Sequence, residues 1–310
     1  MKNIYKVNSD HISMRLDRWI KKTISDVPQS LIEKCIRKGN IKINNKKEKS
    51  SYKLKKNDQI ILYNFSFSAQ LHKKKTNIYE PSKKDLLFSS DIFIEDNENF
   101  SVINKPAGIA VQIGTKSRKN IIDILRKTKE FKNYNPYTVH RIDKETSGIL
   151  LVAKNRKYAQ LFTSLFRIRK IKKIYLGLAL GQIYPNKGKF EDNLFHYEGN
   201  KKILTKALTF YEVIDSNQNY SLLRLNPYTG RKHKLRKQLS MRGNPIIGDN
   251  KYKITNNFTR NKLMLHAYKI QFLIDGVKYN FTAKPPKEFE EIIKKKIFKN
   301  SLDIILSISL

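Results

Sequence analysis

The feature that most limits the possible folds is a polar stretch of nine residues, His140 to Gly148 (HRIDKETSG), between two apolar runs. The run YTV precedes it and the run ILLVA follows it, and both have the composition of buried segments. Asp, Lys, Ser and Gly are typical of turns, because their polar groups satisfy local backbone groups. The stretch is therefore either an ordinary turn or a catalytic loop, and the rest of the sequence is needed to distinguish the two.

An extended backbone through YTVHRID would bring a cation and a carboxylate together. Side chains alternate along a strand, so Arg141 and Asp143 would share one face. A nearby guanidinium favours the charged form of a carboxylate, and we therefore expect Asp143 to be ionised at neutral pH. A nucleophile or a general base requires that state. Glu145, further along the loop, is expected to face solvent.

The chain carries a large positive charge. Its 310 residues include 63 Lys and Arg against 27 Asp and Glu, which gives a net charge of +36. Such a surface repels itself unless a polyanion is nearby, so we expect a nucleic-acid partner whose binding weakens steeply with salt. The bias toward Lys, Ile and Asn also arises from genome composition, so a merely solvated basic surface stays open as the alternative. A hydrophobic content of 39% supplies a core for at least one large domain.

Cysteine usage and the first residues bear on the compartment. Cys35 is the only cysteine, so neither an intramolecular disulfide nor a four-thiolate metal site can form. The histidines have no common metal-ligand spacing. The opening residues lack the apolar core of a signal peptide, and no run approaches the roughly 18 apolar residues that span a bilayer. We therefore expect no metal, no membrane association and a cytoplasmic protein.

Two short helices are predicted near the start of the chain. The segment MRLDRWIKKTI has apolar residues at helical spacing, with Arg and Lys mostly on the other face. In the second helix, after Pro28, Ser30 and Glu33 form a capping box. Gly39 is a fitting C-terminal stop for it. The strand-like segments IKIN and QIIL follow, so residues 1–63 are expected to form one small compact unit.

This order resembles the αL RNA-binding motif, a small module of ribosomal proteins and modification enzymes. The resemblance rests on RLDRWIKK, SLIEKCIRKGNIKIN and YKLKKNDQI, and it covers residues 13–62. One departure is Asn57, where members usually carry Gly, but Asn tolerates the left-handed conformation of such a turn. Trp19 and Cys35 are expected in the core. The basic residues expected to contact RNA are Arg15, Arg18, Arg37, Lys38 and Lys42.

The rest of the chain divides into a linker, a larger domain and a tail. Residues 64–86 lose the periodicity and gather Lys, Ser and one Pro, which is typical of a linker. The larger domain is expected over residues 87–297, followed by a C-terminal tail, 298–310. Its strand-like runs are FSVIN, ILLVA, YLGLAL, YSLLRL and LMLHAYKIQF, separated by helices such as IIDILRK and YAQLFTSLF. This mixture predicts an α+β fold on a mixed or antiparallel sheet.

Five motifs of the larger domain resemble the RluA family of RNA pseudouridine synthases. HRIDKETSGILLVAKN resembles the family's H-R-L-D-x-x-T-S-G loop, whose Asp is catalytic. The other motifs stand in the family's order: NKPAGIAVQIG, KIYLGLALGQ, TGRKHKLRKQLSMRGNPIIGD and LMLHA. With the αL module, the resemblance covers residues 13–287 and is greatest to the RluC-type branch, which acts on large-subunit ribosomal RNA. It implies that the polar stretch is a catalytic loop.

The resemblance also implies a role for each matching residue. Asp143 is expected to be the catalytic carboxylate, and Arg236 its partner. Tyr175 is expected to pack against the target base and to take part in proton handling. Arg141 is expected to fill the space of the extruded uridine, and Leu235 to shape the pocket floor. Further contacts to the substrate or the RNA are expected from His140, Arg231 and His233.

The implied reaction breaks an N-glycosidic bond, turns the uracil and rejoins it through carbon, so no cofactor is expected. Lys232 and Lys234 stand where the family usually has Thr and Gln, which bears on phosphate contacts near His233 and on the uridines accepted. The high charge favours a monomer. The rival hypothesis is a non-catalytic RNA-binding or ribosome-assembly protein on the same fold.

Overall fold

The computed structural model divides into two compact units, Met1–Asn77 and Ile78–Leu310. It describes residues 2–8, 11–24, 28–63, 79–83, 85–86, 90–113, 119–198, 201–252 and 262–296. The division falls within the expected linker, of which residues 64–78 lie outside the described residues. The predicted tail, 298–310, lies outside them as well.

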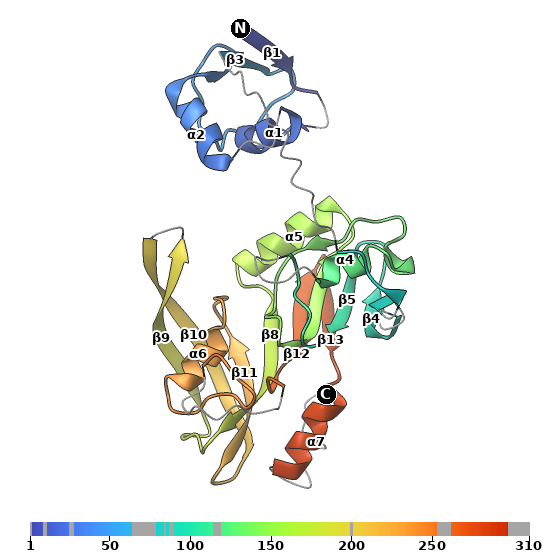
Figure 1. The fold of residues 1–310 in the computed structure, drawn as a ribbon, viewed down its shortest axis with the longest axis vertical. Helices are drawn as coiled ribbons and strands as arrows, with labels where there is room; N and C mark the ends of the chain where they lie inside the picture. Colours follow the sequence, from blue (N-terminus) through green and yellow to red (C-terminus); the bar gives the residue numbers. More distant parts are fainter. Residues whose placement is uncertain are drawn as a thin grey trace. The chain divides into compact units, whose positions relative to one another are not determined.

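The smaller unit combines two helices with an antiparallel three-stranded sheet (Figure 1). In chain order its elements are β1 Lys2–Lys6, α1 Leu16–Thr23, α2 Gln29–Lys38, β2 Ile41–Ile43 and β3 Gln59–Tyr63. The strand order is β1-β3-β2. The sequence did not predict β1, because KNIYK forms an edge strand whose side chains are mostly exposed and which therefore lacks an apolar pattern.

The core of the smaller unit lies between its helices and its sheet. Trp19 and Cys35 are buried there, as predicted. Gly39 ends α2 in the left-handed region with a φ of 82°, which confirms it as the C-terminal stop. Asn57 has a φ of 66°, so the departure from Gly is accommodated as expected.

The predicted capping box of α2 is wrong. Pro28 occupies the N-cap and the helix begins at Gln29, so Ser30 lies inside the first turn, where it cannot cap. The carboxylate of Glu33 instead accepts a hydrogen bond from the side-chain amide of Gln29 at 3.1 Å. The fixed φ of proline sets the start of this helix in place of a side-chain cap.

The larger unit is built on a ten-stranded sheet with the order β4-β5-β7-β12-β8-β11-β10-β9, in which β13 pairs with β12 and β6 with β7. The strands are β4 Phe93–Asp96, β5 Phe100–Lys105, β6 Tyr137–Thr138, β7 Ser147–Ala153, β8 Lys172–Leu180, β9 Lys187–Glu198, β10 Lys201–Ser216, β11 Tyr220–Pro227, β12 Leu265–Ile274 and β13 Val277–Thr282. The helices are α4 Ile121–Leu125, α5 Arg156–Arg167, α6 Lys234–Ser240 and α7 Lys287–Lys296, with the short 3-10 helices η2 Ser90–Ile92 and η3 Lys129–Phe131. Among the described strands β7 and β12 pair in parallel and the other pairs are antiparallel, which confirms the predicted α+β fold on a mixed sheet.

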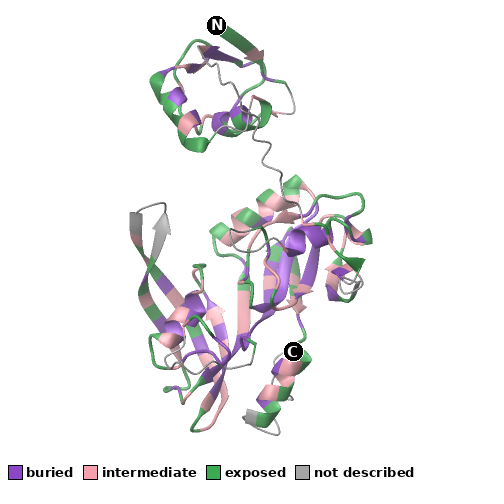
Figure 2. Cartoon of the chain, in the orientation of Figure 1, coloured by how far each residue is buried: buried purple, intermediate pink, exposed green. Residues whose placement is uncertain are grey.

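The apolar runs predicted as strands correspond to β5, β7, β8, β11 and β12, and the predicted helices to α4 and α5. Figure 2 shows that the buried residues concentrate in the middle of the larger unit's sheet and thin out toward the end of the β9–β10 hairpin. The sequence did not predict this hairpin, because Lys and other polar residues interrupt its apolar positions. One face of β10 is exposed, so burial imposes no apolar pattern on it.

The strand β12 joins the two halves of the sheet, since it lies between β7 and β8. Ala267 pairs with Gly148 of β7 on one side and with Tyr175 of β8 on the other. Gly148, the last residue of the polar stretch, and Tyr175 of a distant motif thus lie on strands that are separated only by β12. The sheet register alone therefore brings these two motifs together.

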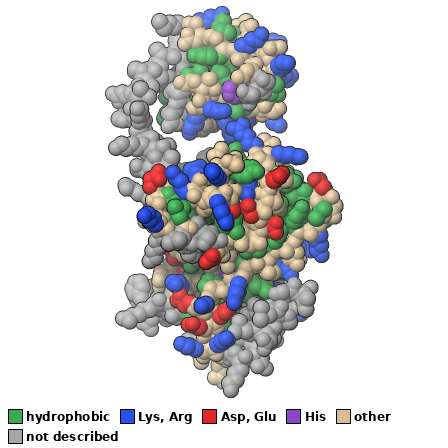
Figure 3. Space-filling view, turned by 90° about the vertical axis from the view of Figure 1, so that its right-hand side faces the viewer, with side chains coloured by type: hydrophobic (Ala, Val, Ile, Leu, Met, Phe, Trp, Pro, Cys, Tyr) green, Lys and Arg blue, Asp and Glu red, His purple; other side chains and the backbone are tan. Residues whose placement is uncertain are grey.

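Basic side chains are spread over the surfaces of both units (Figure 3). In the same view, the acidic side chains gather on the larger unit. None of the helices within the described ranges is long and apolar enough to cross a membrane.

Candidate active site

The polar stretch lies between β6 and β7, and its last residues hold it to the sheet. Gly148 has a φ of 106°, and a Cβ at this position would overlap the backbone of Ala267 in β12. Ser147 Oγ lies 2.9 Å from His266 Nδ1, and His266 Nε2 lies 2.9 Å from the carbonyl of Ala283. A carbonyl only accepts, so Nε2 carries the proton and Ser147 donates to Nδ1. Burial lowers the pKa of His266 to about 4, which fits this neutral tautomer.

A buried lysine supports the loop from below. Lys105 Nζ donates to the carbonyls of Pro106, Ile109 and Lys144 at 2.6, 2.9 and 3.2 Å. The amide of Gly108 donates to the same Lys144 carbonyl at 2.9 Å. Burial lowers the pKa of Lys105 to about 7, but three acceptors match the three N–H bonds of the protonated amine. The NKPAG motif thus fixes the backbone next to Asp143.

Asp143 lies in the loop with its carboxylate mostly buried, at 17% side-chain exposure. Arg236 Nη1 is 3.9 Å from its Oδ2, and His233 Nε2 is 3.6 Å from its Oδ1, so neither contact is within hydrogen-bond distance. Burial raises the pKa of Asp143 above its usual value, and the charges of Arg236, Arg141, Lys232 and Lys105 offset part of that effect. The expected cations are present, but the effect of desolvation on the pKa of Asp143 is larger than theirs.

Arg236 is oriented by a carboxylate that the sequence did not single out. Its Nε and Nη2 donate to Asp249 Oδ2 and Oδ1 at 2.7 and 2.6 Å, a bidentate pair. Although burial acts to raise it, hydrogen bonds from Arg236, Tyr252 and Lys251 hold the pKa of Asp249 below its usual value. Arg236 is therefore fixed by Asp249 and presents its remaining nitrogen to Asp143. The only sequence indication of Asp249 was its place at the end of the GNPIIGD segment.

His233 and Tyr252 complete the surroundings of the carboxylate. His233 is the N-cap residue of α6 with a φ of 54°, and its Nδ1 lies 2.9 Å from the hydroxyl of Tyr252. Burial, with the charge of Arg236, lowers the pKa of His233 to about 4, so its ring is neutral at pH 7. The guanidinium of Arg236 lies 5.2 Å from the centre of the Tyr252 ring. The sequence gave no indication of Tyr252, which lies outside the quoted motifs.

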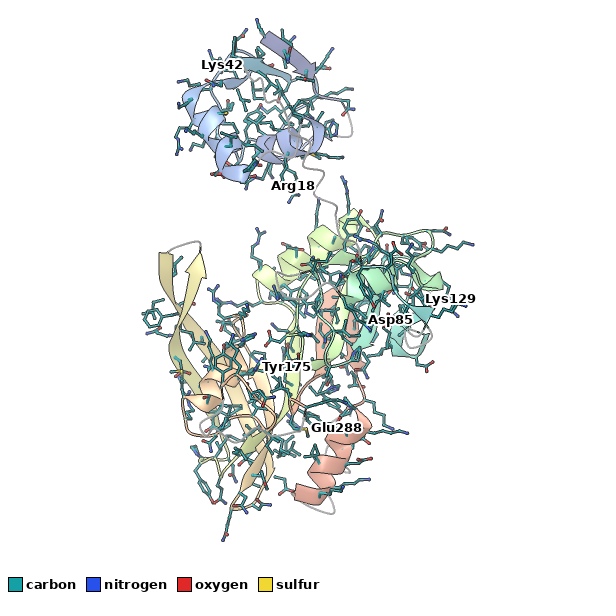
Figure 4. All side chains as sticks on the ribbon, viewed as in Figure 1. Arg18, Lys42, Asp85, Lys129, Tyr175 and Glu288 are labelled. Atoms are coloured by element: carbon teal, nitrogen blue, oxygen red, sulfur yellow. The ribbon has the colours of Figure 1, made fainter. Side chains whose placement is uncertain are left out.

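Tyr175 lies on β8 in the middle of the larger unit, where Figure 4 labels it. Its ring is half-buried and packs against the two apolar clusters on either side of it. Burial, with the nearby charge of Asp143, raises the pKa of Tyr175, so its hydroxyl stays protonated. The structure thus brings Asp143, Tyr175 and Arg236 to one place, each from a different motif.

His140 makes contacts that hold the loop in position. Its Nε2 accepts a hydrogen bond from the amide of Leu151 at 2.8 Å, and its ring stacks on Phe166 with centres 4.5 Å apart. Burial lowers the pKa of His140 to about 3, so the ring is neutral. The ring lines the cleft described next, but Nε2 is bonded to the backbone and is not free for a substrate.

These residues open onto a cleft of about 1290 Å³. Leu235 is buried at its edge, and Arg141 is exposed on the loop. Among the described lining residues, Asp143 is the one carboxylate. The basic lining residues are Arg141, Arg167, Arg169, Lys172, Lys173, Lys206, Arg231, Lys232, Lys234 and Arg236. The cleft therefore suits a polyanion, and its one acidic group lies where the loop enters it.

The two lysines that depart from the family pattern have different surroundings. Lys234 is buried, and its Nζ donates to the Leu208 carbonyl at 2.7 Å and to Thr229 Oγ1 at 3.3 Å. Burial, with the charge of Lys173, lowers the pKa of Lys234 to about 7. Lys232 is exposed at the start of α6. Lys234 thus holds α6 to β10, and Lys232 adds charge at the cleft.

The five basic residues predicted in the smaller unit do not form one patch. Arg18 and Lys42 lie at opposite ends of this unit in Figure 4. Arg15 is paired with Asp17, with Nη2 2.6 Å from Oδ2, and Lys42 Nζ lies 5.1 Å from the centre of the Tyr63 ring.

Comparison with known proteins gives two family matches and several relatives. Residues 99–241 match RNA pseudouridylate synthase, and residues 14–60 match the S4 domain. The ribosomal large subunit pseudouridine synthase C of Rickettsia felis is 32% identical over 294 residues, which cover 90% of this chain and 96% of that relative. The protein of the same name from Buchnera aphidicola subsp. Schizaphis graminum is 32% identical over 286 residues, which cover 87% and 89%.

Two solved structures share the fold. Human RNA Pseudouridylate Synthase Domain Containing 4 superposes with a TM-score of 0.59 and 24% identity, covering 68% of this chain and 95% of that one. Human RNA Pseudouridylate Synthase Domain Containing 1 gives a TM-score of 0.57 and 23% identity, covering 74% and 97%.

Proposed function

The chain belongs to the family of RNA pseudouridylate synthases, and from that membership we propose that it isomerises uridines of large-subunit ribosomal RNA to pseudouridine. The bond between C1′ and N1 breaks, the uracil turns, and C1′ bonds to C5. C5 loses a proton and N1 gains one, so no oxidant, reductant or energy source is consumed. We expect no cofactor for this reaction.

The observation that carries the proposal is Asp143, the one carboxylate among the described residues of a strongly basic cleft. The bidentate pair with Asp249 fixes Arg236 before any substrate binds, which favours catalysis because no reorganisation is needed. In this proposal Asp143 is the catalytic carboxylate and Arg236 stabilises its charge. Tyr175, as a neutral phenol, packs against the detached base and keeps it in place.

The target uridine has to leave a stacked RNA to reach Asp143. Unstacking costs a few kcal/mol, which basic contacts to the backbone have to offset. Arg141, exposed on the loop, is suited to enter the space that the uridine leaves. Both Leu235 and Arg231 line the cleft. We propose that Leu235 shapes its floor and that Arg231 contacts phosphate.

The smaller unit is proposed to add affinity for large RNA. It matches the S4 domain and exposes Arg15, Arg18, Arg37 and Lys38. We propose residues 1–63 as the RNA-binding domain, 64–86 as the linker and 87–297 as the catalytic domain. We further propose that the protein acts as a monomer in the cytoplasm on ribosomal RNA.

The test is a single isosteric substitution, Asp143→Asn. The substrate is large-subunit ribosomal RNA from a strain that lacks the gene. We expect the variant to form no pseudouridine in this RNA, while its affinity for the RNA stays within about twofold of that of the wild type. Glu145→Gln is the matched control, because Glu145 is an exposed carboxylate of the same loop, with 53% side-chain exposure. Its product formation should equal that of the wild type.

The same experiment separates the rival hypothesis. If wild type and Asp143→Asn both bind the RNA and neither forms pseudouridine, the chain is a non-catalytic RNA-binding protein on this fold. If Asp143→Asn isomerises uridine at the normal rate, the assignment of the catalytic carboxylate is wrong.

A further inference from the structure

The face of β10 that lines the cleft carries apolar side chains that are open to solvent. Side chains alternate along a strand, and the alternate residues Leu204, Lys206, Leu208 and Phe210 all line the cleft. Leu204 is 51% exposed and Phe210 is 46% exposed. The opposite face of β10 is packed, since Thr209 is buried and its hydroxyl donates to Gln238 of α6 at 2.6 Å. Burial in the core therefore does not explain the apolar residues on the cleft side.

Neighbouring strands extend this apolar face. Leu204 pairs in register with Phe195 of β9, which is 49% exposed. The amide of Tyr228 donates to the Leu208 carbonyl at 3.0 Å, so this tyrosine lies next to the strand, and it is 48% exposed. We call the set Phe195, Leu204, Leu208, Phe210 and Tyr228 the β10 platform. Large side chains exposed side by side mark an interaction surface.

Cations accompany the platform. The guanidinium of Arg169 lies 4.7 Å from the centre of the Tyr228 ring. Arg231 and Lys232 line the same cleft. Aromatic rings beside fixed cations are the arrangement with which proteins bind unpaired nucleotides, because bases stack on the rings while phosphates meet the cations.

The platform is continuous with the catalytic end of the cleft. Leu204, Phe210 and Tyr228 line the same cleft as Asp143. A target nucleotide that enters the cleft therefore brings its chain neighbours against β10. Unpaired neighbours can stack there, whereas neighbours held in a duplex cannot turn their base faces toward the sheet.

We propose that the β10 platform binds the unpaired nucleotides next to the target uridine by stacking, and so selects uridines in single-stranded segments or loops. The proposal rests on the proposed function and deepens it by naming a specificity surface. Stacking of a base on an aromatic ring changes affinity by about 5- to 100-fold when the ring is removed. The platform therefore contributes to the choice of target as well as to affinity.

The test uses the full chain with Phe210→Ala and Tyr228→Ala, singly and together. The probe is a 12-nucleotide single-stranded RNA with 2-aminopurine next to its one uridine, compared with the same strand in a duplex. Binding is measured in the Asp143→Asn background, so that no product forms. We expect each variant to weaken binding of the single strand about 5-fold or more, to reduce the quenching of 2-aminopurine, and to leave binding of the duplex unchanged.

The chain offers Tyr184 as a matched control for Tyr228 and Leu273 as a second exposed apolar control. Tyr184 is 70% exposed and Leu273 is 59% exposed, and neither lines the cleft. Tyr184→Ala and Leu273→Ala should bind both probes as the parent does. The variants Phe210→Tyr and Tyr228→Phe keep the ring and should restore quenching, which a mere loss of folding would not allow.

Several outcomes would overturn the proposal. One is that the platform variants behave as Tyr184→Ala does. Another is that the variants weaken binding of the single-stranded and the duplex probe equally, which would indicate a general loss of charge or of folding. A defect confined to ribosomal particles, with normal binding of the naked RNA, would assign the platform to a protein partner. If the wild type binds and quenches the probe but isomerises no uridine in ribosomal RNA, the proposed function fails while the platform stands.

Discussion

At the scale of single residues, Asp143 experiences two opposing effects. Burial favours its neutral form and the surrounding cations favour its charged form, with burial the larger effect. The sequence predicted the cations correctly from HRID and from the family pattern. It also predicted that guanidinium neighbours favour the ionised form of Asp143, but it did not predict that burial raises the pKa of Asp143, because the extent of burial depends on the whole cleft and not on two neighbours.

The first prediction concerns stability at Asp143. A carboxyl group whose folded pKa is raised stabilises the fold below its unfolded pKa, and that contribution is lost as pH rises through the folded pKa. At pH 7 the ionised group therefore destabilises the protein. Asp143→Asn should therefore raise the Tm at pH 7 while abolishing activity. The increase in Tm should become smaller at acid pH, and Glu145→Gln should show no increase. A lower Tm for Asp143→Asn at pH 7 would contradict this account.

The second prediction concerns Lys234, which stands where the family usually has Gln. Its folded pKa is lowered from 10.5 to about 7, so its stabilising contribution is present above 10.5 and is lost as pH falls toward 7. The difference between the two pKa values sets an upper limit of about 5 kcal/mol on the loss of unfolding free energy. Lys234→Gln should therefore stabilise the protein against urea more at pH 6.5 than at pH 9.5, because glutamine keeps a donor for Leu208 and Thr229 without the charge.

The control for Lys234 is its exposed neighbour. Lys232→Gln removes the same charge from the same helix end, but it removes no buried group. Its effect on unfolding should be small and equal at the two pH values. An effect of Lys234→Gln that is the same at pH 6.5 and pH 9.5 would mean that the lysine is not destabilised by burial.

The residues that the sequence missed share a property. Asp249 and Tyr252 act through contacts made across turns and between distant elements, and Lys105 acts through backbone carbonyls. No short-range pattern encodes such contacts. Asp143, Tyr175 and Arg236 were predicted because each stands within a motif of its own. Their common location could not be predicted, because it follows from the register of β12 with β7 and β8 and, for Arg236 on α6, from the pair with Asp249.

At the scale of elements, apolar patterns predicted the strands that are buried and missed those that are exposed. The strands β5, β7 and β12 are rich in apolar residues because both of their faces are mostly buried. One face of β10 lies on the cleft, and polar residues such as Lys206 interrupt its apolar positions, so its sequence does not show a buried-strand pattern. The start of α2 was missed because proline took the place of a capping side chain.

The third prediction belongs to the pairing of β7 with β12. Gly148→Ala should destabilise the protein by about 3 kcal/mol or more, because the methyl group would overlap Ala267 and the φ of 106° is unfavourable for alanine. Urea unfolding measures the change. Gly276→Ala is the control, since its φ of 81° is also positive but no atom lies within 4 Å of an added Cβ. It should cost about 1 kcal/mol. Equal losses of stability for Gly148→Ala and Gly276→Ala would show that β7 and β12 can move apart to accept the methyl group without a further loss of stability.

At the scale of the whole molecule, the sequence predicted two units and a nucleic-acid partner from periodicity, composition and charge. The net charge of +36 is consistent with both the cleft and the smaller unit. The boundaries near residues 63 and 86 stay predictions. Within the expected linker, the amide of Tyr79 donates to Asp123 and the side chain of Asp85 is buried, so these residues pack on the larger unit. Target choice could not be predicted, since it depends on surfaces such as the β10 platform that no motif marks.

The fourth prediction assigns the smaller unit to RNA affinity. Deletion of residues 1–63 should weaken binding to large-subunit ribosomal RNA about tenfold or more at physiological salt and reduce the salt dependence of binding. Activity on a short RNA fragment should fall much less, because the cleft is formed within the larger unit. Circular dichroism of the truncated protein controls for folding. Full affinity for the large RNA after truncation would give residues 1–63 a different task.

The place of β12 between the two halves of the described sheet has a consequence for how such a chain can change. The half with β5 and β7 positions the loop of Asp143, and β10 presents the platform on the face opposite to α6. Substitutions of the platform side chains therefore leave the contacts of α6 and the position of Asp143 intact. Laboratory evolution toward new RNA targets should therefore accumulate its successful substitutions on β9 and β10. Substitutions along β12 should be eliminated early, because they would disturb chemistry and target choice at once.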